Sequence, residues 1–165
     1  MLRRALARTT VLLTLACSDG NQPDLPDAGS FDVSLSGARS GQVAGSATAG
    51  PANTELGDFY AIGMFATARD STIAFVTLIC PFSVPIAVGT YQFGPGQLCE
   101  ARYGLAASNG FSPIELALAE SGSMTVSVSN DQEIDGRFRF QGPLVAGADT
   151  VGVVSASGSF RAAQL

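Results

Sequence analysis

The sequence predicts an all-β fold, either an antiparallel β-sandwich or a small β-barrel of about eight or nine strands. Apolar and polar residues alternate along several short segments, and turn residues separate these segments at intervals of about 8 to 12 residues. The chain has 165 residues, 46% of them hydrophobic, and it contains 19 Gly. This is enough for one domain around one core, which we expect over residues 31–165.

The first half of this domain contains four candidate strands. Residues 31–36 alternate apolar and polar side chains, which is typical of a strand with one buried face. Residues 42–49 are rich in glycine and alanine, and a proline soon after them is expected to break the strand. Segments 58–68 and 71–80 are close enough to form a hairpin. The second of these is apolar on both faces, which indicates a central strand.

The second half contains five more candidate strands and one ambiguous segment. The strands are expected at 89–93, 97–107, 123–129, 134–140 and 150–160, and the last three fit an antiparallel meander.

The ambiguous segment lies near residues 112–121. Its apolar residues alternate between 114 and 118 as in a strand. Residues 112–115, Ser-Pro-Ile-Glu, instead match a helix capping box with proline at the first helical position. We expect one short helix or turn here.

The first sixteen residues have the pattern of a signal peptide. Three arginines, Arg3, Arg4 and Arg8, precede a short apolar run at 11–16. This run is far shorter than the roughly 20 apolar residues that a transmembrane helix needs.

Residues 13–17, Leu-Thr-Leu-Ala-Cys, resemble the lipobox of bacterial lipoproteins. In that family a small residue precedes a cysteine that is diacylated and becomes the new N-terminus. Ala16 and Cys17 match this pattern, whereas the two residues before Ala16 depart from it. The resemblance implies an exported protein held at the cell envelope through Cys17, and Ser18 implies the outer membrane. The alternatives are ordinary cleavage nearby, which leaves Cys17 as a free thiol, and an uncleaved cytosolic start.

Residues 17–30 would then be the lipidated cysteine followed by a flexible tether, because the segment is polar and contains two prolines. All nine basic residues of the chain are arginines and three belong to the leader, so six arginines face fourteen carboxylates in the mature chain. This acidic balance argues against nucleic acid as a partner. The expected partners are the membrane, through Cys17, and an envelope protein or a small ligand.

Three cysteines are present. If Cys17 is lipidated, Cys80 and Cys99 remain as a pair that an oxidising compartment would join. Such a disulfide closes a loop of about 20 residues and stabilises the fold by roughly 3 kcal/mol in the chain-entropy model. Two buried free thiols are the alternative.

The sequence contains few residues suited to catalysis. It has no histidine and no lysine, which removes the commonest general base and the Schiff-base mechanisms. Asp131, Glu133 and Asp135 copy the start of an EF-hand calcium loop, but Gly142 occupies the position of the bidentate glutamate. We therefore expect a solvated turn, with weak calcium binding as the alternative, no catalytic residue and no cofactor.

These observations predict a lipid-anchored envelope domain with a non-catalytic binding or structural role. The alternative is a carrier that holds a small apolar ligand inside a barrel, with an enzyme third. An open interior would favour the carrier, and a packed one would favour the first interpretation. The residues expected to line the carrier pocket are Phe65, Phe75, Ile79, Leu105 and Phe138.

Overall fold

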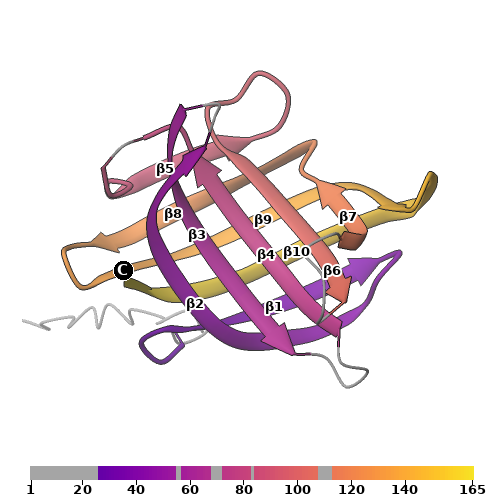
Figure 1. Cartoon of the computed structure of the whole chain (residues 1–165), viewed down its shortest axis with the longest axis horizontal. Coiled ribbons are helices and arrows are strands. Elements are labelled where there is room, and N and C mark those ends of the chain that lie inside the picture. Colours follow the sequence, from indigo (N-terminus) through magenta and orange to yellow (C-terminus); the bar gives the residue numbers. More distant parts are fainter. Residues whose placement is uncertain (1–25, 55–56, 68–71, 83, 108–112) are drawn as a thin grey trace, which may run out of the picture.

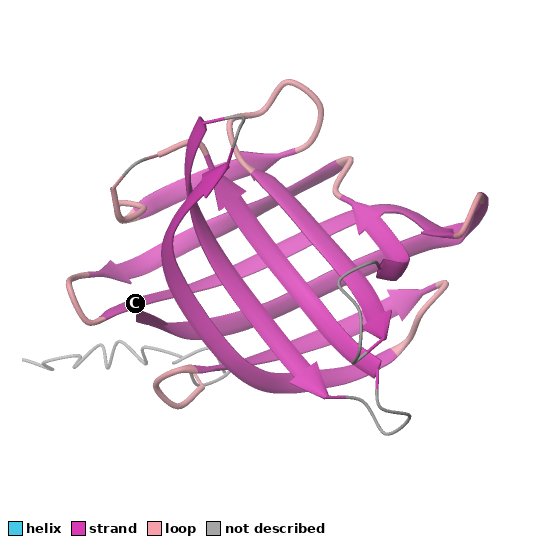
Figure 2. Cartoon of the chain, viewed as in Figure 1, coloured by secondary structure: helices cyan, strands magenta, loops and turns pink. Residues whose placement is uncertain are grey.

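A computed structural model describes residues 26–54, 57–67, 72–82, 84–107 and 113–165. In this part of the chain all regular structure is β-strand, so the predicted all-β class is confirmed (Figure 2). The strands are β1 (Ser30–Gly37), β2 (Gly41–Thr54), β3 (Gly57–Thr67), β4 (Thr72–Cys80), β5 (Gly89–Phe93), β6 (Glu100–Ala107), β7 (Pro113–Leu118), β8 (Ser121–Ser129), β9 (Glu133–Ala146) and β10 (Asp149–Gln164).

Eight of these strands close into a hydrogen-bonded ring in the order β1, β2, β3, β4, β6, β7, β9, β10 and back to β1. All the neighbours along this ring are antiparallel. Strands β1, β8, β9 and β10 cross behind β2, β3, β4 and β6 (Figure 1). Beyond the first residue of β1, the end of β10 makes a short parallel contact with β2.

Strands β7 and β8 follow one side of β9 as a single interrupted strand. β7 pairs with the last residues of β9, and β8 pairs with the preceding part of β9 and carries β5 on its other edge. Gly142 lies at the interruption, where an added Cβ would stand 1.8 Å from the carbonyl oxygen of Leu118. Glycine therefore permits the close approach of two backbones at this point.

The expected short helix near 112–121 is wrong, because residues 113–118 form β7. Its backbone is paired with β6 on one edge and β9 on the other, and these ladders satisfy the groups that a helix would have paired internally. β7 is also the strand that raises the total above the expected eight or nine. The expected break after residue 49 is wrong as well, because β2 continues through Pro51, which pairs opposite Tyr60.

The core fills the space enclosed by the ring. Alternation along each strand places one set of side chains inside, and Phe31, Tyr60, Ile62, Met64 and Phe160 are each at most 2% exposed. Aromatic rings pack against one another there, with 6.0 Å between the centroids of Phe138 and Phe140. The interior is therefore a packed core, as in other small barrels.

A disulfide joins Cys80, at the end of β4, to Cys99, just before β6, with 4.3 Å between their Cα atoms. Both cysteines are buried in the core. The loop they close contributes Ile86 to the core and packs Phe82 edge-on against Tyr91, with 6.1 Å between ring centroids. The predicted pairing of the two cysteines is thus the one that the structure contains.

Candidate binding surface

In the described part of the chain, the interior of the ring is filled by a cluster of buried side chains. Phe138 points inward and is 4% exposed, but Phe65 lies on the outer surface with 49% of its area exposed. Phe75 and Ile79 alternate with buried neighbours along β4 and therefore face outward as well. Phe65 lies opposite Phe75 on the outer face, whereas Leu105 packs against the core, as Phe138 does. The five residues expected to line a carrier pocket are thus divided between the two faces of the sheet.

Over part of their length, four adjacent strands carry polar residues at their outward positions. These residues form what we call the polar surface, and the alternation that buries the intervening residues turns them outward; all are at least partly exposed except Ser159, which is 7% exposed. Its members are Ser121, Ser123 and Thr125 of β8; Arg137, Arg139 and Gln141 of β9; Ser155, Ser157 and Ser159 of β10; and Asp32, Ser34 and Ser36 of β1.

The register of the strands arranges these side chains in rows across the sheet. Arg139 lies opposite Ser123 on one side and Ser157 on the other, and Ser157 lies opposite Ser34. In the next row Arg137 has Thr125 and Ser159 as its neighbours. Each arginine is therefore flanked by hydroxyl-bearing residues at the short cross-strand distance of about 5 Å between Cβ atoms.

Small side chains on both sides of β9 leave the polar surface hollowed. One hollow, which we call the polar groove, has a volume of about 810 Å³. Its lining residues are Asp32, Ser34, Gln42, Ala44, Ser123, Thr125, Arg137, Phe138, Arg139, Ser157, Gly158 and Ser159. A second hollow of about 440 Å³ shares Ser123, Arg139 and Ser157 with it.

The arginines of this sheet differ in their partners. Arg161 contacts two carboxylates, with 3.1 Å from its Nε to Asp135 Oδ2 and 3.7 Å to Glu133 Oε2. Arg139 forms no ion pair with any residue that the structure describes, and its side chain is exposed. Asp32, on β1, is the one carboxylate among the residues that line the polar groove.

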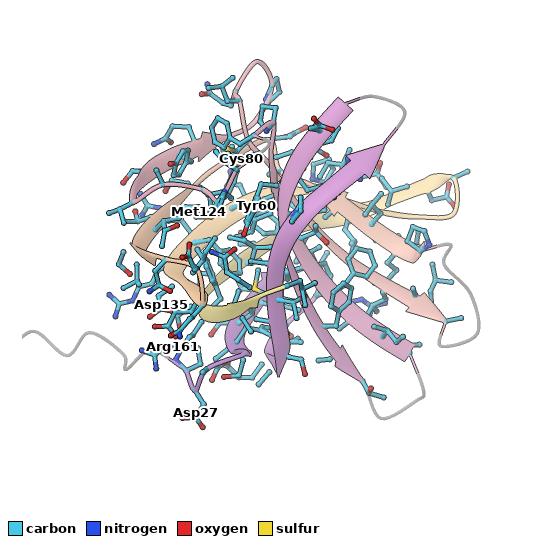
Figure 3. All side chains as sticks on the ribbon, turned by 60° about the vertical axis from the view of Figure 1, so that its left-hand side comes forward. Asp27, Tyr60, Cys80, Met124, Asp135 and Arg161 are labelled. Atoms are coloured by element: carbon cyan, nitrogen blue, oxygen red, sulfur yellow. A yellow bond between two sulfur atoms is a disulfide. The ribbon has the colours of Figure 1, made fainter. Side chains whose placement is uncertain are left out.

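The acidic residues predicted as a weak calcium site do not form a metal-binding group. Asp135 is 1% exposed and pairs with Arg161, as Figure 3 shows, and Glu133 contacts the same guanidinium. Asn130 accepts hydrogen bonds from the backbone N–H groups of Gln132 and Glu133, as in an Asx turn. Among residues 26–165 outside the gaps, no three carboxylate or cysteine side chains are placed to hold a metal ion.

A second part of the outer surface is apolar, and we call it the apolar surface. Ile114 and Leu118 of β7 are about half exposed, and so are Val151 and Val153 of β10. Pro143 lies opposite Val153, so these residues are continuous across the end of β9. A hollow of about 350 Å³ lies on this surface.

An ion pair links the turn after β1 to β7. Arg39 donates two hydrogen bonds to the Glu115 carboxylate, one of them 2.7 Å long from its Nε. This contact raises the pKa of Arg39 further above its ordinary value. Nearby, burial raises the pKa of Tyr103, and the charge of Glu115 adds to the effect while Arg39 opposes it.

The predicted lipidation residue, Cys17, and the leader lie outside the described residues. No helix in the described part of the chain is both long and apolar enough to cross a membrane.

The polar groove was missed at the level of sequence. The sequence does contain the polar residues of the groove in an alternating pattern: serine or threonine stands at every second position in 121–125 and 155–159, and arginine stands at 137 and 139. They become a site only when the register brings them together, and register between distant strands is not readable from alternation alone.

Comparison of the chain with protein-family models, with curated proteins and with solved structures gave no match in any of the three.

Proposed function

We propose that this chain is a lipid-anchored cell-envelope domain with a non-catalytic binding role, and that the polar groove is where it binds. The observation that carries the proposal is the contrast between a filled interior and a hollowed outer surface. A ligand of this domain would therefore be held outside the ring of strands.

Two features support the exported location. The Cys80–Cys99 disulfide fits an oxidising compartment, since cytosolic thiols are normally kept reduced. The pattern of arginines, apolar run, Ala16 and Cys17 resembles a lipoprotein leader. Residues 17–30 would span at most about 50 Å when fully extended, which limits how far the domain can stand from the membrane.

The experiment is expression of the full chain in a bacterial host with two membranes, followed by detergent phase partitioning and mass spectrometry of the N-terminal peptide. We expect a diacylglyceryl adduct on Cys17 and recovery of the chain in the detergent phase. Cys17→Ser is the matched control and should move the chain to the aqueous phase. A wild-type product that retains residues 1–16 in the cytosol would contradict the proposal.

A further inference from the structure

We infer that the polar groove binds an oxyanion, a phosphate or sulfate group of a larger molecule, and that Arg139 is its principal ligand. The inference rests on the proposed function, because it names the chemical class that the groove would recognise.

The first step of the argument is the availability of Arg139. Its side chain is exposed on β9, between β8 and β10, and it lines both hollows of the polar surface. No carboxylate of the described chain pairs with it, in contrast to Arg161, whose guanidinium contacts Glu133 and Asp135. A guanidinium presents its donors in a planar fork that matches two oxygens of a phosphate or sulfate group.

The second step is the set of donors around it. Ser123 and Ser157 lie directly opposite Arg139 on the two neighbouring strands, so a hydroxyl-bearing side chain flanks Arg139 on each side. Arg137 and Thr125 repeat the arrangement two residues along the strands, at about 7 Å. An anion seated over Arg139 would thus meet a second cation and several hydroxyl donors within one groove.

The third step is the contrast with the rest of the molecule. The chain has a formal net charge of −5 and only nine cationic side chains, yet two of them stand on one face of β9 with one residue between them. An anion bound near Arg137 and Arg139 would gain Coulomb attraction from both guanidinium groups. Asp32, the carboxylate of the groove, lies on β1, two strands away from β9.

The experiment uses the full chain with Cys17→Ser, so that acyl chains take no part. Sodium phosphate and sodium sulfate are titrated separately while the nuclear magnetic resonances of the arginine Nε–Hε groups and the backbone amides are followed. We expect saturable shifts at Arg139, Ser123 and Ser157. Arg139→Gln should weaken phosphate binding at least about tenfold, as expected for a lost charge-assisted contact.

Arg102→Gln is the matched control, because it removes the same charge from a different strand, where Arg102 pairs with Glu100. It should change the affinity for phosphate by less than about twofold, since a distant surface charge is screened by salt. A dispersed, native-like spectrum of Arg139→Gln shows that the fold is intact. Absence of shifts at Arg139, or equal weakening by both substitutions, would overturn the inference.

The source of the oxyanion is decided with vesicles of phosphatidylglycerol and of phosphatidylcholine. Binding of the Cys17→Ser chain to the first but not the second, with loss in Arg139→Gln, assigns the groove to anionic lipid headgroups. Shifts with phosphate and no vesicle binding assign it to a phosphorylated or sulfated solute. Acylation of the wild-type chain at Cys17 with no response of the groove would overturn this inference and leave the lipid anchor standing.

Discussion

Strands β9 and β10 each carry a polar part and an apolar part of the outer surface, and both change at the same level of the sheet. On β9 the outward residues are Arg137, Arg139 and Gln141, followed by Pro143 and Val145. On β10 the change falls between Ser155 and Val153, which are the partners of Gln141 and Pro143. The inward residues stay apolar on both sides of this boundary.

The comparison separates what the fold requires from what it permits. Inward positions are fixed by the core, because a polar group buried there without a partner would cost several kcal/mol. Outward positions are under no such constraint, so the fold permits arginine and serine in one part of these strands and proline and valine in the other. Paired variants in the two parts test this separation.

The largest effect is expected in the core beneath the polar surface. Phe160 is fully buried, and its ring covers Gly136, where an added Cβ would lie 2.7 Å from the ring. Phe160→Ala should lower the free energy of unfolding by about 3 to 5 kcal/mol, because it removes a large buried side chain and leaves a cavity. The measurement is a guanidinium unfolding curve.

Phe65→Ala is the matched control for this prediction. It makes the same chemical change at a side chain that is half exposed on the outer surface of β3. The loss should be well below that of Phe160→Ala. Equal losses in the free energy of unfolding would contradict the assignment of Phe160 to the core and of Phe65 to the outer surface.

The disulfide should give the next largest effect. It ties β4 to the segment before β6, whereas the strands of the polar surface contain no such link in the described structure. Replacing both Cys80 and Cys99 with alanine should lower the free energy of unfolding by about 3 kcal/mol in the chain-entropy model. Hydrogen exchange should rise first in the amides of β4 and β6, while the amides of β9 and β10 stay protected.

Much of this architecture was readable from the sequence, since strict alternation predicted β1, β8 and the buried positions of β9. The β3–β4 pair and the antiparallel order of β8, β9 and β10 also followed, because short turns make sequential strands pair. The segment that forms β7 was misread. Its local capping signal was stronger than its alternation, and pairing with two distant strands decided its structure.

The sites were less predictable for a related reason. The pairing of Cys80 with Cys99 could be predicted by counting, because the chain has three cysteines and the lipoprotein interpretation assigns Cys17 to the lipid anchor. The polar groove could not be predicted from the sequence, because Ser123, Arg139 and Ser157 are brought together by strand register and by the curvature of the sheet. Closure of the ring depends on β1 meeting β10, a contact between the two ends of the domain.

Alkaline pH should lower the free energy of unfolding through two buried tyrosines, Tyr60 on β3 and Tyr103 on β6. Burial raises the pKa of both phenols above the unfolded value of about 10, so their neutral forms are favoured in the folded state. This contribution is fully present below about pH 10 and is lost as the pH rises through the folded-state pKa values. Tyr103→Phe should reduce the fall in stability between about pH 9 and pH 11, measured by urea unfolding. An unchanged fall would contradict the role of Tyr103.

The smallest effects on stability are expected from substitutions across the polar-to-apolar boundary itself. Val153→Ser and Ser157→Val alter outward positions on the same strand, so each should change the free energy of unfolding by no more than about 0.5 kcal/mol. Their surface properties should diverge, because Val153→Ser removes part of a contiguous apolar area and Ser157→Val interrupts a row of hydroxyls. Fluorescence of a hydrophobic dye should fall with Val153→Ser, and phosphate binding should weaken with Ser157→Val. If each substitution instead affected both measurements equally, the two parts of the surface would form one binding site rather than two separate regions.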